Sequence, residues 1–172
     1  MTIALIILVA VLALLAYAAT RPDSFRIERS LRIQAAPAHV FALIASLREF
    51  NRWNPWLKKD PATQGEYGAT DSGPGGSYAW TGTKTGSGRM TIVESAPGRQ
   101  LVRLEFFKPM VATNMAEFTV VPDGDGARVS WAMYGPANFV SRLMQVFISM
   151  DRMVGRDFEQ GLASLKTLAE TA

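Results

Sequence analysis

Asp151 is the residue whose type and position first raise a question of chemistry. The segment "LMQVFISMDRMVGRDFEQGLASLK" (residues 143–166) has the period of an amphipathic helix, and Asp151 falls on its apolar side between Phe147 and Phe158. A carboxylate there is costly to bury unless it has a partner. It is either a ligand anchor or a general acid inside a cavity, or a structural group paired with an arginine or an indole N–H. The sequence leaves both interpretations open.

The other chemically useful residues are few and scattered. His39 is the one histidine, lies off the neighbouring helical stripe and is expected to be exposed, and the chain has no cysteine. No metal site and no Ser–His–Asp set is therefore expected. The glycine-rich stretches "SGPGGS" and "GTKTGSG" match no phosphate-binding motif and fall between strands. The sequence thus predicts no cofactor and no metal.

Tryptophans form a second group of candidates. Trp80 and Trp131 are expected on the inner face of a sheet, where they could stack on a ligand or simply fill the core. Trp53 and Trp56, in "NRWNPW", either guard a cavity mouth, dip into a bilayer interface, or plug one end of the sheet. The sequence does not decide among these roles.

The first twenty residues, "MTIALIILVAVLALLAYAAT", carry no charge. A run of about 20 apolar residues covers the roughly 30 Å of a bilayer core. A cleaved signal peptide is the alternative, with Ala16-Tyr17-Ala18 as its cleavage site, but no basic residue precedes the run and the run is long. We predict a membrane anchor over residues 1–20 and one domain over residues 21–172.

Charge gives further expectations about location and partners. The net charge of +3 is modest and its basic residues are dispersed, so no nucleic-acid surface is expected. Arginines follow the apolar run and none precedes it, which favours a single-pass protein with a cytoplasmic domain. Lack of cysteine fits either side of a membrane.

Periodicity then predicts the elements that position these residues. Residues 25–33 alternate as a strand, and Pro37 opens a helical pair that ends before Pro55. Residues 63–134 read as six strands with short turns, and one helix is expected over residues 138–169. The prediction is an α+β fold in which a curved antiparallel sheet of about six or seven strands wraps around the long C-terminal helix.

Alternation within the strands predicts the side chains that face this helix. They are Tyr78, Trp80, Met90, Ile92, Val102, Leu104, Phe106, Ala116, Phe118, Val120, Val129, Trp131 and Met133.

This layout resembles a known family. The stretches "RIQAAPAHVFALIASLREFNRWNPW", "GPGGSYAWTGTKTGSGRMTIVESAPGRQLVRLEFFKP", "ARVSWAMYGP" and "MDRMVGRDFEQGLASLK" are similar to the START-like (SRPBCC) superfamily and its polyketide cyclase/dehydrase and lipid transport group. The resemblance covers residues 25–169 and implies a helix-grip fold with a cavity for an apolar ligand between sheet and helix. It carries over no catalytic motif.

Three functions follow as hypotheses. In the first, a membrane-tethered domain binds or transports a hydrophobic small molecule or lipid. The expected binding residues are Tyr78, Trp80, Met90, Phe106, Phe118, Trp131, Met133, Phe147, Asp151 and Phe158. The alternatives are a polyketide cyclase or dehydratase that uses Asp151 as acid or base together with Tyr78, and an interaction domain without a ligand.

Overall fold

The computed structural model describes residues 2–147 and 149–171, and within the helix that ends at Phe147 it describes no side chain of Val140, Met144, Gln145 or Phe147. The elements in chain order are α1 (Thr2–Ala19), β1 (Ser24–Ile33), α2 (Pro37–Ala45), α3 (Leu47–Trp53), α4 (Pro55–Lys59), β2 (Gln64–Tyr67), β3 (Ser77–Gly82), β4 (Gly86–Ala96), β5 (Arg99–Lys108), β6 (Ala112–Asp123), β7 (Gly126–Pro136), α5 (Phe139–Phe147) and α6 (Met150–Glu170).

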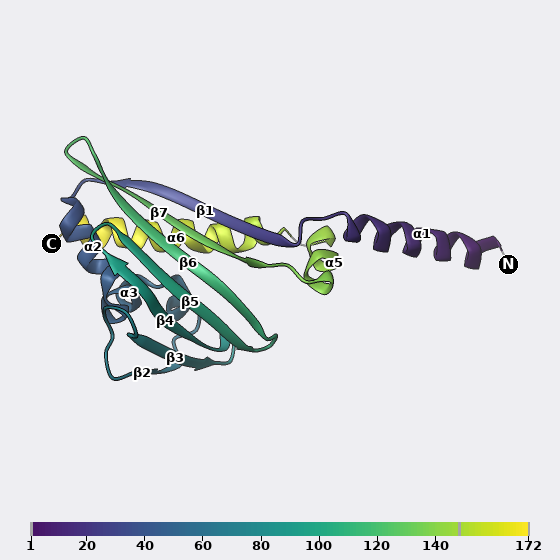
Figure 1. The fold of residues 1–172 in the computed structure, drawn as a ribbon, viewed down its shortest axis with the longest axis horizontal. Coiled ribbons are helices and arrows are strands. Elements are labelled where there is room, and N and C mark those ends of the chain that lie inside the picture. The colour runs from purple at the N-terminus through teal and green to yellow at the C-terminus, as the bar shows by residue number, and fades with distance from the viewer. Residues whose placement is uncertain (1, 148, 172) are drawn as a thin grey trace.

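The strands form one antiparallel sheet in the order β1-β7-β6-β5-β4-β3-β2. Strands β2 to β7 follow one another as a meander, while β1 pairs with β7, so that Ser24 lies opposite Pro136. The sheet curves around α6, which runs along its inner face (Figure 1). The predicted α+β helix-grip architecture is therefore confirmed.

Two helical predictions need correction. The expected single helix over residues 138–169 is two helices, because α6 has its own N-cap: the Ser149 hydroxyl accepts a hydrogen bond from the Arg152 N–H at 3.2 Å. Pro55, expected to end the helical region, instead begins α4. Proline is well placed there, since the first turn of a helix does not need its N–H. The Asn54 side chain caps this helix by accepting from the Trp56 N–H at 3.0 Å.

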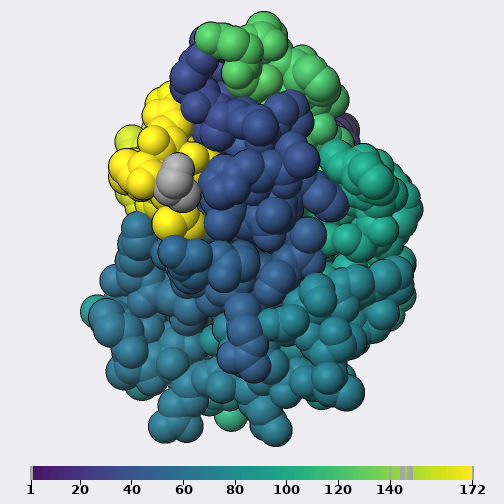
Figure 2. All heavy atoms as spheres, turned by 90° about the vertical axis from the view of Figure 1, so that its left-hand side faces the viewer, coloured from purple at the N-terminus to yellow at the C-terminus, as the bar shows by residue number. Residues whose placement is uncertain are grey.

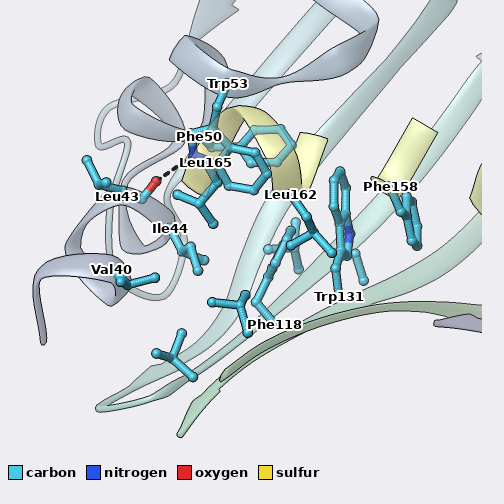
Figure 3. Packing of buried hydrophobic residues seen from close by; sticks show 14 of the residues in the cluster. Val40, Leu43, Ile44, Phe50, Trp53, Phe118, Trp131, Phe158, Leu162 and Leu165 are labelled. Carbon is cyan, nitrogen blue, oxygen red and sulfur yellow. Dashed lines mark hydrogen bonds between the residues drawn. The ribbon is translucent and has the colours of Figure 1, made fainter. Parts of the chain in front are cut away.

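The inward-facing strand residues are those that alternation predicts, and they are buried or half-buried. At the end of the sheet opposite α1, α3 brings Phe50 and Trp53 against Phe118 and Trp131 (Figure 3). The Trp53 indole N–H donates to the Leu43 carbonyl oxygen at 2.9 Å. Trp53 therefore plugs this end of the sheet, one of the three roles considered for it.

Figure 2 looks onto this closed end, where α2 and α3 lie over the sheet beside the last turns of α6. The β6–β7 hairpin projects from the same end, far from α1 (Figure 1). Helix α1 extends from the opposite end. The two ends of the domain therefore differ, one being packed shut and the other joined to α1.

Helix α1 is the one helix among residues 2–147 and 149–171 that is long and apolar enough to cross a membrane, a test that a signal sequence also passes. It contacts α5, which reaches its last residue, Ala19. Ala18 is fully buried. The Arg142 guanidinium of α5 donates to the carbonyl oxygens of Ala19 and Arg21 at 3.3 Å each, which supplies partners at the helix C-terminus.

Candidate ligand-binding cavity

A cavity of about 200 Å³ lies between the sheet and the helices α4 and α6. Val154 enters it from the second turn of α6, Phe106 from the end of β5, and Thr85 from the β3–β4 turn. Its full lining is Asn54, Trp56, Leu57, Thr63, Tyr78, Trp80, Thr85, Met90, Leu104, Phe106, Met133 and Val154. Five of the predicted binding residues, Tyr78, Trp80, Met90, Phe106 and Met133, are among them.

A smaller void of about 30 Å³ lies deeper, toward the closed end of the sheet. It shares Trp56, Met90, Leu104 and Met133 with the larger cavity. Three more predicted residues, Phe118, Trp131 and Phe158, line it. Trp131 stacks on Phe158 with ring centroids 4.1 Å apart and planes 8° from parallel, so these rings close the cavity floor.

Sequence reasoning missed the residues that lie outside regular strands. Thr63 and Thr85 stand in loops, and Leu57 stands on the short helix α4, so no alternation or long stripe identifies them. Trp56 was a candidate for the cavity mouth, and the structure places it in the lining. Phe147 belongs to the expected set, but its side chain lies outside those described.

Two hydroxyl groups of the lining lie side by side at the β3–β4 turn. The hydroxyls of Thr63 and Thr85 are 3.0 Å apart. Behind them, Asp60 is buried, and its carboxylate accepts from the N–H groups of Lys84 at 2.8 Å and Thr85 at 3.2 Å. These backbone hydrogen bonds lower the pKa of Asp60 below its ordinary value. Asp60 therefore stays ionised and fixes the β3–β4 turn, which carries Thr85.

Tyr78 contributes a phenol to the cavity wall. Its side chain lies across Gly65 of the neighbouring strand, where any larger residue would collide with the ring. Burial raises the pKa of Tyr78, and nearby Tyr67 raises it further. The phenol therefore keeps its proton at neutral pH and offers a hydrogen bond to a ligand.

The Trp80 indole forms another part of the wall. It meets Phe106 edge to face, with ring centroids 5.8 Å apart, and its N–H donates to the Thr85 carbonyl oxygen at 3.4 Å. Gly88 of β4 makes room for it, because a Cβ there would meet both the indole and the Glu105 carbonyl oxygen. The shape of this wall depends on glycine at position 88.

Asp151 was expected among the binding residues but does not line the cavity, and it is instead the structural group paired with an arginine that the sequence also allowed. Its side chain is 62% exposed, and its carboxylate accepts from the Arg29 guanidinium at 2.9 and 3.0 Å. Arg29, on β1, also donates to Glu159 at 2.8 Å, and between the two acids it lies over Gly155. The hydrogen bond from Arg29 lowers the pKa of Asp151, so the carboxylate stays ionised. Asp151 faces the sheet, but in the first turn of α6 it meets only the sheet rim.

The buried acid of α6 is Asp157, which sequence reasoning overlooked. It is 8% exposed, and its carboxylate accepts from the Trp56 indole N–H at 3.0 Å and from the Lys59 ammonium. These contacts fasten α4, and with it one wall of the cavity, to α6. The sequence did contain a signal that Asp157 is buried. It lies three residues after Val154 and four before Gly161, and both of these are on the inner side of the helix.

These groups define what the cavity can do. Its lining is mostly apolar and includes the adjacent hydroxyls of Thr63 and Thr85, which suits shape-based binding of a hydrophobic molecule. Across residues 2–147 and 149–171, no three His, Cys, Asp or Glu side chains lie close enough together to hold a metal ion.

Comparisons with solved structures identify the same fold. CV1439 from Chromobacterium violaceum aligns with a TM-score of 0.61 at 17% identity, covering 87% of this chain and 99% of that one. MLL2253 from Mesorhizobium loti gives 0.65 at 10% identity, covering 86% and 98%. The Aha1 dimer from Colwellia psychrerythraea gives 0.55 at 13% identity, covering 85% and 96%. At these identities the similarity shows the fold alone.

A search of curated proteins found no match. A family model does match, over residues 24–170, which include every strand and the cavity lining. The model describes polyketide cyclases, dehydrases and lipid transport proteins. The chain therefore belongs to the polyketide cyclase/dehydrase and lipid transport family.

Proposed function

We propose that the chain binds a small hydrophobic molecule, or the chain of a lipid, in the cavity while α1 holds the domain at a membrane. The observation that carries this proposal is the cavity itself. Its volume of about 200 Å³ exceeds the roughly 150 Å³ of an engineered apolar cavity that binds benzene. Drug-sized sites begin at about 300 Å³. The expected occupant is one ring or a short length of acyl or isoprenoid chain.

The hydroxyls of the cavity lining support a ligand with one polar group. Thr63, Thr85 and Tyr78 offer hydroxyls, while Trp80, Met90 and Phe106 offer only apolar surface. A ligand hydroxyl that donates to the threonine oxygens would keep its hydrogen bond as the body is buried, since the Thr85 hydroxyl itself donates to Asp60 at 3.3 Å. The family description, which includes lipid transport, supports the same class of ligand.

Asp151 gives no support to the alternative of acid–base catalysis. It lies at the surface in an ion pair with Arg29, and the lowered pKa of its carboxyl group opposes use as an acid near neutral pH. Tyr78, with a raised pKa, faces the cavity alone among the groups considered for that chemistry. Binding without chemistry is the function that these positions favour.

Helix α1 supports the tether. Nearly all of its apolar side chains are exposed, and insertion into a bilayer would remove them from water. Tethering would keep the cavity close to a source of hydrophobic ligand and raise its effective concentration there. The contacts of Arg142 with the end of α1 support a defined orientation of the domain at that membrane.

The test fills the cavity and measures what the protein carries. The full chain, purified in detergent, is extracted with organic solvent, and the extract is quantified by mass spectrometry per mole of protein. Val154→Phe places a ring in the cavity, and Val121→Phe, at an exposed strand position far from it, is the matched control.

We expect a hydrophobic molecule at one per chain in the wild type and in Val121→Phe, and several-fold less in Val154→Phe. Equal amounts in all three proteins, or none in any after incubation with a lipid extract, would overturn the proposal. Thermal melts of both variants show whether Val154→Phe is still folded, so that loss of ligand is not mistaken for loss of structure.

A further inference from the structure

We infer that the β5–β6 turn and α5 form a membrane-contact surface that seats the domain on a lipid bilayer. The surface comprises Phe107, Lys108, Met110, Val111 and Phe139. The inference rests on the proposed role of α1 as a membrane anchor. It adds a second contact, which sets how the cavity is presented to the bilayer.

Exposed apolar side chains at the turn are the first observation. Phe107 is 47% exposed, Met110 54% and Val111 83%. Turns at the tips of hairpins normally carry polar residues, and clustered apolar side chains on a surface mark a site of contact. The β5–β6 turn thus exposes three large apolar side chains to solvent, although its backbone adjoins the β3–β4 turn.

Strand register places this tip at the end of the sheet from which α1 leaves. Met115 of β6 pairs with Tyr134 of β7, and Pro136, two residues further along β7, pairs with Ser24 at the start of β1. Residues 109–111 precede β6 and therefore lie beyond that level. Figure 1 shows the turn, α5 and the end of α1 all on the same side of the domain.

Helix α5 extends the same surface toward the anchor. The sequence of α5 is strongly amphipathic. Phe139, at its start, is 40% exposed. Helix α5 also contacts α1 and reaches its last residue, Ala19. A short amphipathic helix beside a membrane anchor is suited to lie in the headgroup region with its apolar side inward.

Charge at this end favours an anionic bilayer. Lys108 at the β5–β6 turn and Lys84 at the β3–β4 turn are both exposed. The two turns adjoin, because Gly86 lies directly against the Lys108 backbone carbonyl. Lysines beside apolar side chains attract anionic headgroups while the apolar groups enter the acyl boundary. At the far end, the acids of the β6–β7 hairpin are paired with arginines: Asp123 with Arg128 at 2.7 Å and Asp125 with Arg32 at 2.6 Å.

A modest tilt completes the geometry. Figure 1 shows α1 near the long axis of the molecule and the β5–β6 turn to one side of it. Membrane-spanning helices tilt by about 20° from the bilayer normal on average. If α1 tilts toward the side of the β5–β6 turn, the turn comes down onto the bilayer surface. The occupant that covers the exposed side chains is then the membrane that holds α1.

Strand alternation connects this surface to the cavity. Phe106 lines the cavity and the next residue, Phe107, belongs to the membrane-contact surface. One strand end thus separates the ligand site from the bilayer. The ligand site and the membrane-contact surface are thus neighbours along β5.

The natural absence of cysteine allows a direct test in the full chain. Single cysteines replace Val111 in the membrane-contact surface, Val121 at the far end, and Leu12 in α1, all at exposed positions. Each carries an environment-sensitive fluorophore, and each protein is reconstituted into nanodiscs of phosphatidylcholine and phosphatidylglycerol. Quenching by lipids with a spin label on the acyl chain reports contact with the bilayer.

We expect several-fold stronger quenching at Val111→Cys than at Val121→Cys, with Leu12→Cys quenched most. Quenching at Leu12→Cys with Val111→Cys no different from Val121→Cys would overturn the membrane-contact surface and leave the anchor intact. No quenching at Leu12→Cys would overturn the anchor itself, and the surface with it. In nanodiscs of phosphatidylcholine alone, the quenching at Val111→Cys should be weaker. Unchanged quenching would show that Lys84 and Lys108 do not contribute to the membrane contact.

Discussion

Asp157 holds the Trp56 indole and the Lys59 ammonium, so that one buried carboxylate joins two helices that form the cavity. Asp157→Ala leaves the indole N–H without an acceptor. Its cost is expected at about 1–3 kcal/mol of the free energy of unfolding, the usual penalty for a stranded polar group. Chemical denaturation of the full chain in detergent measures it.

Asp151→Ala is the matched comparison on the same helix. Because the Asp151 side chain is 62% exposed, its pair with Arg29 should contribute only about 0–1 kcal/mol. Equal losses for the two alanine variants would contradict the assignment of Asp157 as the structural acid.

The lowered pKa of Asp60 predicts that the stability of the folded protein depends on pH. Its pKa in the folded protein lies below the ordinary 3.8, so the unfolded chain binds the proton more readily. Its contribution is therefore complete above about pH 4 and is lost as the pH falls through the folded-state pKa. Melting temperatures of wild type and Asp60→Asn should diverge above about pH 4 and converge in stronger acid. Parallel curves would show that the carboxylate charge does not matter.

The contrast between Asp151 and Asp157 marks what residue patterns can reveal. Helical periodicity gives the side of a helix on which a residue lies, and Asp151 does face the sheet. It gives no position along the helix axis, so the first turn of α6, beyond the packed region, looked the same as a core turn. An arginine on a distant strand, Arg29, decides the environment of Asp151, and no local pattern contains that partner.

At the scale of elements, glycine at position 88 sets the spacing of three strands. Gly88→Ala would push a methyl group against Trp80 and the β5 backbone. Overpacking of this kind costs about 1–3 kcal/mol. The displaced indole should also reduce ligand content in the extraction assay. Arg89→Ala, an exposed change on the same strand, should leave both quantities unchanged, and equal effects of the two substitutions would contradict the role given to Gly88.

Strand alternation predicted the inner face well because each side of a strand has one environment along its length. Met90, Leu104 and Met133 accordingly lie where they were expected. The break between α5 and α6 was missed because apolar residues continue through it at helical spacing. Only the capping geometry of Ser149 reveals the break, and a serine in the sequence is compatible with either outcome.

For the whole molecule, the anchor predicts a measurable mass and location. The protein isolated from bacterial membranes should have the mass of the uncleaved chain and remain in the membrane after alkaline carbonate extraction. Burial of Ala18 and the contacts of Arg142 around it argue against cleavage at that point. A mass corresponding to cleavage after Ala18, with soluble protein, would establish a signal peptide instead.

The pairing of β1 with β7 sets an order of events during synthesis. Ser24 pairs with Pro136, which is synthesised 112 residues later (136 minus 24). The pair cannot form until then. At about 5–20 residues per second, the wait is on the order of 5–20 seconds. During that time β1 is an unpaired strand that directly follows the apolar helix α1. Its alternating charges, Arg26, Glu28 and Arg32, discourage the strand from pairing with the wrong chain while the rest of the sheet is still being made.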